Sequence, residues 1–159
     1  MNFSGYFTLF GSMLIALLLM IVPLPDWLST IWPLWIVVVI AYWMLALPHR
    51  VGLGSACFFG LLLDVFNNTL FGQHALALVI VAYVMDKMHR QVRMFYWWQQ
   101  SIVMMLLAFF YCLSLYAVQR YLHEIHLNWQ YWLPIVSTGV VWPLVYGVLR
   151  HYRQKFRIT

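Results

Sequence analysis

Six apolar runs, separated by short polar or proline-containing breaks, account for most of the chain. They cover approximately residues 6–22, 28–47, 51–66, 70–85, 101–118 and 133–149. Prolines end the first two runs, because proline in a helix interior removes a backbone hydrogen bond and clashes with the preceding turn. A helix of about 17–25 apolar residues can cross a bilayer. The pattern therefore predicts six helices whose lengths are close to that of a membrane span.

The third and fourth runs, 51–66 and 70–85, are the shortest and are joined by only three residues. They fit either a re-entrant pair or a tight transmembrane hairpin. The positions of the basic residues do not distinguish the two arrangements, because both leave Arg50 and the 87–93 segment on the same side of the membrane. A hairpin of two helices satisfies its backbone hydrogen bonds internally, which is required in lipid. We therefore favour the hairpin.

Composition excludes a soluble protein. Hydrophobic residues make up 65% of the chain and charged residues 8%, against about 25% charged in typical soluble domains. No stretch has the basic polar surface of a nucleic-acid-binding module. Cys57 and Cys112 both lie within apolar runs and are interpreted as small packing residues. We expect one all-α integral membrane domain over residues 1–159, built as a six-transmembrane-helix bundle.

The basic residues indicate the orientation of that bundle. If all six runs cross and the N-terminus is cytoplasmic, the outer loops carry only Arg120. The inner segments then carry Arg50, Lys87, Arg90, Arg93, Arg150, Arg153, Lys155 and Arg157. Such a bias is typical of cytoplasmic segments and predicts that both termini are cytoplasmic. The same side chains suit contact with anionic phospholipid, at about 1 kcal/mol each, or docking of a cytoplasmic protein.

Small residues recur every four positions at the start of the third run. Gly52, Ala56, Gly60 and Asp64 would share one face of a helix, and small residues let a neighbouring backbone approach closely. A charge at a span centre costs about 2.5–3.5 kcal/mol, so Asp64 needs a partner. It is either a functional contact or a structural acceptor for the 67–72 turn, Gln73 or His74.

The sixth run repeats this spacing with Gly139, Pro143 and Gly147. The glycines permit close helix packing, and Pro143 should kink the helix. Each of the two faces could be covered by a helix of the same chain or by a partner subunit, a homodimer included.

We find no fingerprint of catalysis. No Gly-x-Ser-x-Gly motif or phosphate-binding glycine loop is present. The segment His123-Glu124-Ile125-His126 lacks the spacing that places two histidines on one helix face. We therefore expect no enzyme activity and no catalytic, cofactor or metal site.

An ordered set of short motifs resembles one family. The motifs in this set are Leu45-Ala-Leu-Pro-His-Arg50, Gly60-x-x-x-Asp64 with Gly72, Trp98-Gln-Gln100, Gly139-Val-Val-Trp-Pro143 and Arg153-Gln-Lys-Phe156. Together they are similar to the rod shape-determining protein MreD family of Gram-negative bacteria. The resemblance covers nearly the whole chain and is weakest around 120–131 and in the N-terminal tail.

That resemblance implies an inner-membrane component of the cell-elongation (rod) complex that maintains rod cell shape. It implies direct association with MreC and action with the MreB filament, with RodA and with the transpeptidase partner of RodA. It also implies a fold related to the substrate-binding subunits of energy-coupling-factor transporters. Two functions follow as hypotheses: a non-enzymatic scaffold, or a small-molecule or lipid carrier whose polar pocket would use Asp64, Gln73 and His74.

Overall fold

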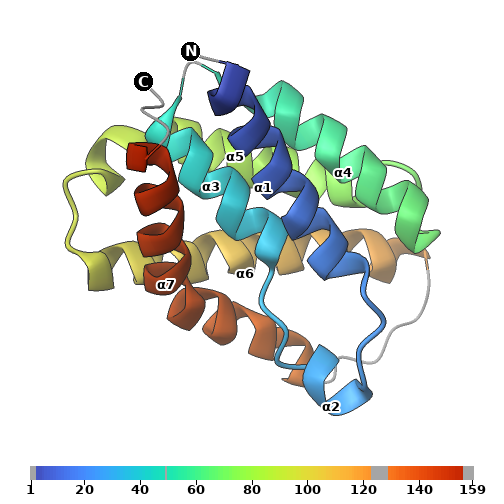
Figure 1. Cartoon of the computed structure of the whole chain (residues 1–159). Helices are drawn as coiled ribbons and strands as arrows, with labels where there is room; N and C mark the ends of the chain where they lie inside the picture. The colour runs from blue at the N-terminus through green and yellow to red at the C-terminus, as the bar shows by residue number, and fades with distance from the viewer. Residues whose placement is uncertain (1–2, 49, 123–128, 156–159) are drawn as a thin grey trace.

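The computed structural model describes residues 3–48, 50–122 and 129–155, and within them every regular element is a helix (Figure 1). The α-helices are α1 (Phe3–Ile21), α2 (Asp26–Ser29), α3 (Trp35–Ala46), α4 (Leu53–Asn67), α5 (Gln73–Val92), α6 (Trp97–Leu122) and α7 (Leu133–Lys155). A 3₁₀ turn, η1 (Trp129–Trp132), precedes α7. The prediction of an all-α protein is confirmed, and each apolar run overlaps one of the longer helices. The helices α5, α6 and α7 continue past the predicted ends of their runs, at 85, 118 and 149.

The second run differs from its prediction. One helix was expected over 28–47, but the structure has the single turn α2, then a turn and an extended segment, and then α3 from Trp35. Pro33 explains the break, because it has no N–H to donate and it disfavours helical backbone at the preceding residue. The expectation is therefore wrong for the first part of this run. At its other end α3 stops at Ala46, just before Pro48, as predicted.

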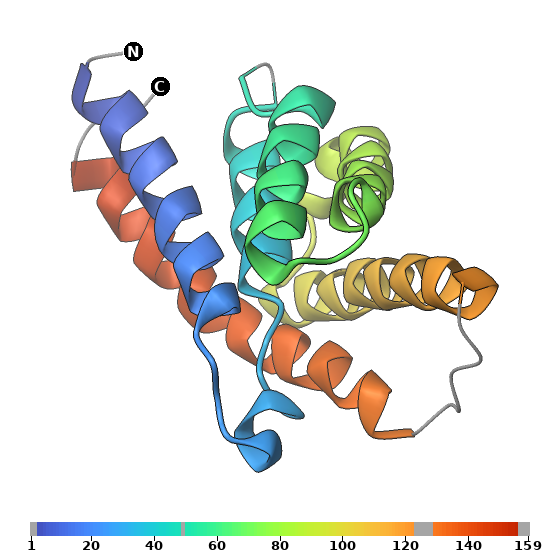
Figure 2. The same ribbon diagram turned by 90° about the vertical axis from the view of Figure 1, so that its right-hand side faces the viewer.

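The short helix α3 forms the centre of the molecule. Ten of its twelve residues, Ile36 to Leu45, are buried. A helix that is apolar on all sides is stable when other helices surround it, and α1, α5 and α7 pack against this one. Figure 2 shows α3 lying behind α4, with α1 and α7 to one side of it.

The remaining helices form two sequential pairs. α4 and α5 pack as an antiparallel hairpin, and α6 contacts both α5 and α7. Figure 1 shows α6 crossing behind α7 and α3, and it shows the two halves of α7 running in different directions. Pro143 lies inside α7 and accounts for this bend, as predicted, because the missing N–H and the ring open the helix at that turn.

Two of the described helical segments are long and apolar enough to cross a bilayer, Trp97–Tyr121 and Gln130–Lys155. Shorter apolar helices cover Thr8–Ile21, Trp35–Ala46 and Leu53–Asn67. At about 1.5 Å per residue, the twelve residues of α3 reach well short of the ~30 Å hydrocarbon core. Six separate crossings remain a prediction.

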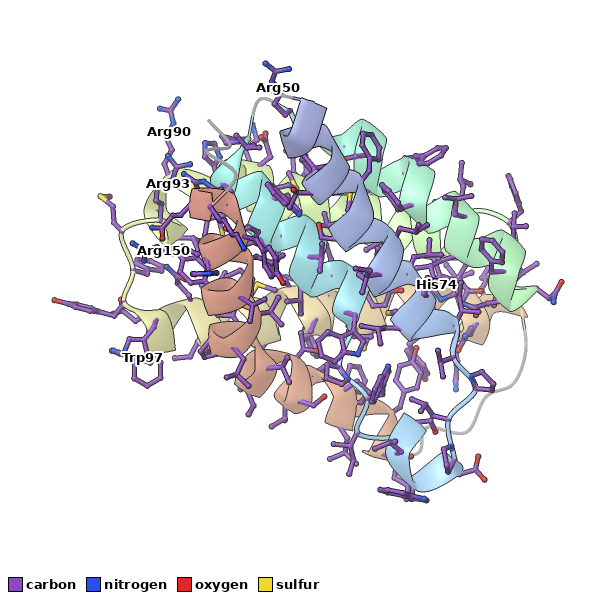
Figure 3. All side chains as sticks on the ribbon, in the orientation of Figure 1. Arg50, His74, Arg90, Arg93, Trp97 and Arg150 are labelled. Atoms are coloured by element: carbon purple, nitrogen blue, oxygen red, sulfur yellow. The ribbon has the colours of Figure 1, made fainter. Side chains whose placement is uncertain are left out.

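The start of α1 and the end of α7 lie at the same end of the molecule (Figures 1 and 2). Figure 3 places Arg50, Arg90, Arg93 and Arg150 towards this end too, with His74 towards the opposite end. We call this end the basic end. The structure thus gathers the basic residues as the orientation argument requires, while the face of the membrane to which they belong stays a prediction.

Candidate functional site: the Asp64 cluster, α7 and the basic end

Asp64, near the end of α4, is 1% exposed and accepts hydrogen bonds from several groups of the following turn and helix. Its Oδ2 accepts from the backbone N–H of Gly72 at 2.8 Å. Its Oδ1 accepts from the N–H of His74 at 2.8 Å, from the His74 ring Nδ1 at 2.9 Å and from the Thr69 hydroxyl at 3.2 Å. Among the partners weighed for Asp64, the structure therefore places it on the 67–72 turn and His74.

The turn between α4 and α5 presents these donors because of two left-handed residues. Asn68 has φ 51° and Gly72 has φ 99°, a region that asparagine and glycine tolerate best. Gly72 precedes the first turn of α5 and has no side chain with which to cap it. The Asp64 carboxyl group supplies the missing acceptor for N–H groups that have no partner inside the helix, where the helix dipole also favours negative charge.

Gly60 explains how α4 and α5 come so close. A Cβ added there would overlap Ala75 Cα and would lie 2.7 Å from Ala75 N. No side chain fits in that space, so glycine is required by the approach of one backbone to the other. Ala56, one turn earlier, is fully buried, whereas Gly52 precedes the helix and a Cβ there would have no neighbour within 4 Å among the described residues. At Gly60 and Asp64 the small-residue face of α4 is thus covered by α5 of the same chain.

The small residues of α7 have a different environment. A Cβ at Gly139 would overlap the side chain of Met105 on α6. Gly147, two turns later, is exposed, and a Cβ there would meet no described atom within 4 Å. Pro143 lies between them at the bend. The two glycines that sequence analysis grouped together therefore face different surroundings.

Sequence reasoning missed two buried polar side chains that join helices. Gln100 of α6 donates to the carbonyls of Val92 and Phe95, both at 3.2 Å, and accepts from the Trp142 indole at 3.3 Å. Thr138 of α7 accepts from the Leu34 N–H at 3.0 Å, just ahead of α3. Each is a polar residue in or beside an apolar run, and this position was the feature of the sequence that could have identified it. The Gln100–Trp142 bond also connects two motifs on which the family resemblance rested.

The predicted basic residues have three different surroundings among those that the structure describes. Lys87 and Arg90 are exposed on α5, with the Lys87 ammonium 5.7 Å from the centre of the Tyr83 ring. Arg93, Arg150 and Arg153 line one cavity, and Arg93 donates to the Leu45 carbonyl at the end of α3. Lys155 lines a second, open cavity beside Gly147. Arg157 and the segment 123–126 lie outside the described residues.

The three polar residues assigned to a carrier pocket lie together but line neither of these two cavities. Asp64 and His74 bond one another, and the Nε2 of Gln73 is buried without a protein partner in the part of the chain that the structure describes. No group of three metal-ligating side chains occurs among the described residues.

Comparison with known proteins agrees with the resemblance. The family model described as rod shape-determining protein MreD matches residues 1–152. The rod shape-determining protein MreD of Haemophilus influenzae is 31% identical over 153 residues, which cover 96% of this chain and 94% of that protein. No solved structure matches the chain, so the expected likeness to energy-coupling-factor transporter subunits stays a prediction. The chain belongs to the rod shape-determining protein MreD family.

Proposed function

We propose that this protein is a non-enzymatic, multi-pass scaffold of the bacterial inner membrane that acts in the rod complex. It would link MreC and the cytoplasmic MreB filament to the peptidoglycan synthases RodA and its transpeptidase partner, and so maintain rod shape. The observation that carries the proposal is the family match over residues 1–152. That family consists of shape-determining membrane proteins and is not known as an enzyme family.

The internal polar groups support a scaffold because they are used to hold the bundle together. Asp64 caps α5, Gln100 joins α6 to α7, and Thr138 binds the chain just ahead of α3. The carrier hypothesis needed Asp64 and His74 for a ligand, and each already has a partner inside the fold. We therefore do not propose the carrier function.

The surface that we propose for MreC is the outer face of α7. Val140, Leu144 and Val148 follow one another at four-residue spacing and are 65%, 70% and 55% exposed. Gly147 is exposed beside Val148, and a small residue on an apolar face lets a second helix approach closely. A single transmembrane helix of MreC would fit along this face.

The basic end would then face the cytoplasm. Arg50, Arg90, Arg93 and Arg150 lie towards this end (Figure 3), as expected for cytoplasmic segments of a membrane protein. The MreB filament would be reached from this end, and the synthases from the membrane and the opposite face.

The experiment replaces Gly147 with Leu and matches it with Gly54→Leu on α4. Both glycines are exposed, and a Cβ at either meets no described atom within 4 Å, so both variants should fold. In a rod-shaped host depleted of its own protein, wild type and Gly54→Leu should restore rod shape and retain MreC on purification. Gly147→Leu should lose MreC and leave the cells round.

Equal MreC recovery with both variants would reject the α7 face. Rod shape in depleted cells that receive no complementing protein would reject the scaffold role as a whole.

A further inference from the structure

We propose that the cavity at the basic end is a binding site for the phosphate group of an anionic membrane lipid. The cavity has a volume of about 290 Å³, room for roughly ten waters at the ~30 Å³ that each occupies in the liquid. It lies between the end of α3, the end of α5 and the last turns of α7. Its lining residues are Tyr42, Leu45, Ala46, Arg93, Tyr146, Arg150, Arg153 and Gln154.

Three guanidinium groups converge here without a carboxylate among the lining residues. The buried carboxylate of Asp64 pairs with His74 instead, towards the other end of the molecule. Arg150 and Arg153 are three positions apart on α7, so they lie on the same side of that helix. Arg93 is held in place by its bond to the Leu45 carbonyl. Among its described lining residues the cavity therefore has three positive charges and no negative one.

Arginine is suited to phosphate because its planar group donates two parallel hydrogen bonds to a pair of oxygens. Arg150 is exposed and Arg153 half-buried, so both have donors to offer a ligand. Figure 3 shows Arg93 and Arg150 as neighbours at the side of the molecule from which α6 begins. An anion at this place would meet donors from α5 and α7 together.

Tyr42 provides a further indication of a ligand. It lines the cavity and is 2% exposed, and its hydroxyl lies beside the Arg153 guanidinium but forms no hydrogen bond of good geometry with a described residue. A buried polar group without a partner is costly. Its ring is fixed edge-on against Trp43 and Tyr146. A phosphate oxygen in the cavity would accept from this hydroxyl.

The surroundings favour a lipid as the source of the phosphate. Met94, Tyr96, Trp97 and Trp98 directly follow Arg93 and are all more than half exposed. Tyrosine and tryptophan gather at the level of the headgroups in membrane proteins. These aromatic residues would therefore place the cavity at the depth of the lipid phosphates. Helix α6 would then run from the cavity into the hydrocarbon core of the membrane.

The test is lipid binding to the purified full chain in detergent, measured by native mass spectrometry. Phosphatidylglycerol and phosphatidylcholine with identical acyl chains are titrated separately. Wild type should hold one phosphatidylglycerol at least about fivefold more tightly than phosphatidylcholine, because the choline cation opposes three arginines. Arg150→Gln with Arg153→Gln should weaken phosphatidylglycerol binding about tenfold or more, through loss of charge-assisted hydrogen bonds.

Two further variants separate this site from general basic charge. Lys87→Gln with Arg90→Gln removes the same charge outside the cavity and should change binding less than about twofold. Tyr42→Phe removes only the hydroxyl and should weaken binding about threefold while circular dichroism stays unchanged. Equal losses in the two double variants would overturn the site, as would equal affinity for the two lipids.

A last arm distinguishes the source of the phosphate. Inorganic phosphate at 20-fold excess over the lipid should leave the phosphatidylglycerol adduct in place. Displacement of the lipid by inorganic phosphate would overturn the assignment to a lipid and assign the cavity to a soluble phosphate.

Discussion

Helices α4 and α7 carry similar patterns of small residues and yet have different surroundings. On α4 the spacing Gly52, Ala56, Gly60, Asp64 ends in a backbone-to-backbone contact with α5 and a saturated carboxyl group. On α7 the spacing Gly139, Pro143, Gly147 begins against a methionine side chain and ends on an open surface. The same spacing thus leads to close backbone packing at Gly60 on α4 and to an exposed surface at Gly147 on α7.

The difference shows that a small residue is informative only together with the atoms that face it. Backbone opposite Gly60 cannot move without moving a helix, whereas Met105 opposite Gly139 is unbranched and adaptable. Where an added Cβ meets no described atom within 4 Å, as at Gly147, the described part of the fold has room for a side chain. Substitutions at the three glycines test this ranking, and a fourth substitution, at Asp64, tests the hydrogen bonds that end the α4 face.

The largest effect is expected for Gly60→Ala. The added Cβ overlaps Ala75 Cα, so α4 and α5 must separate, at a cost of about 3 kcal/mol in the free energy of unfolding. Unfolding by sodium dodecyl sulfate in mixed micelles, followed by circular dichroism, measures the loss. A variant as stable as wild type would show that the hairpin packs less closely than described.

A smaller loss is expected for Asp64→Asn. The amide keeps one acceptor oxygen but turns its NH₂ towards the donors that Asp64 now satisfies, at Gly72 and His74. We expect a loss of about 2 kcal/mol, typical of hydrogen bonds to a charged group, in the same unfolding assay. Wild-type stability combined with a loss of rod shape would instead give Asp64 a direct role in partner contact.

The smallest effect is expected for Gly139→Ala. The Met105 side chain can rotate away from the new Cβ, so the loss should stay near 1 kcal/mol. Gly147→Ala is the matched control on the same helix. It should be stabilised by up to about 1 kcal/mol, because alanine exceeds glycine in helix propensity. If both variants lose equal stability, the distinction between the two ends of α7 is wrong.

Part of the Asp64 cluster was accessible from sequence, because the lone acidic residue inside an apolar run had to find polar partners nearby. The 67–72 turn and His74 were the nearest choices, and the structure uses both. The cavity at the basic end was not accessible. Arg93 is separated from Arg150 by the whole of α6, and only the packing of α7 against α3 brings the two to one place.

By itself the sequence determined the helical class, the membrane setting, the order of the longer helices and the family. These follow from local properties, since apolar length, proline positions and the order of motifs act within one segment. Only the tertiary structure decided which small residues are covered and that α3 is enclosed on all sides. Those outcomes depend on which helices lie side by side, and residues far apart in the chain set that arrangement together.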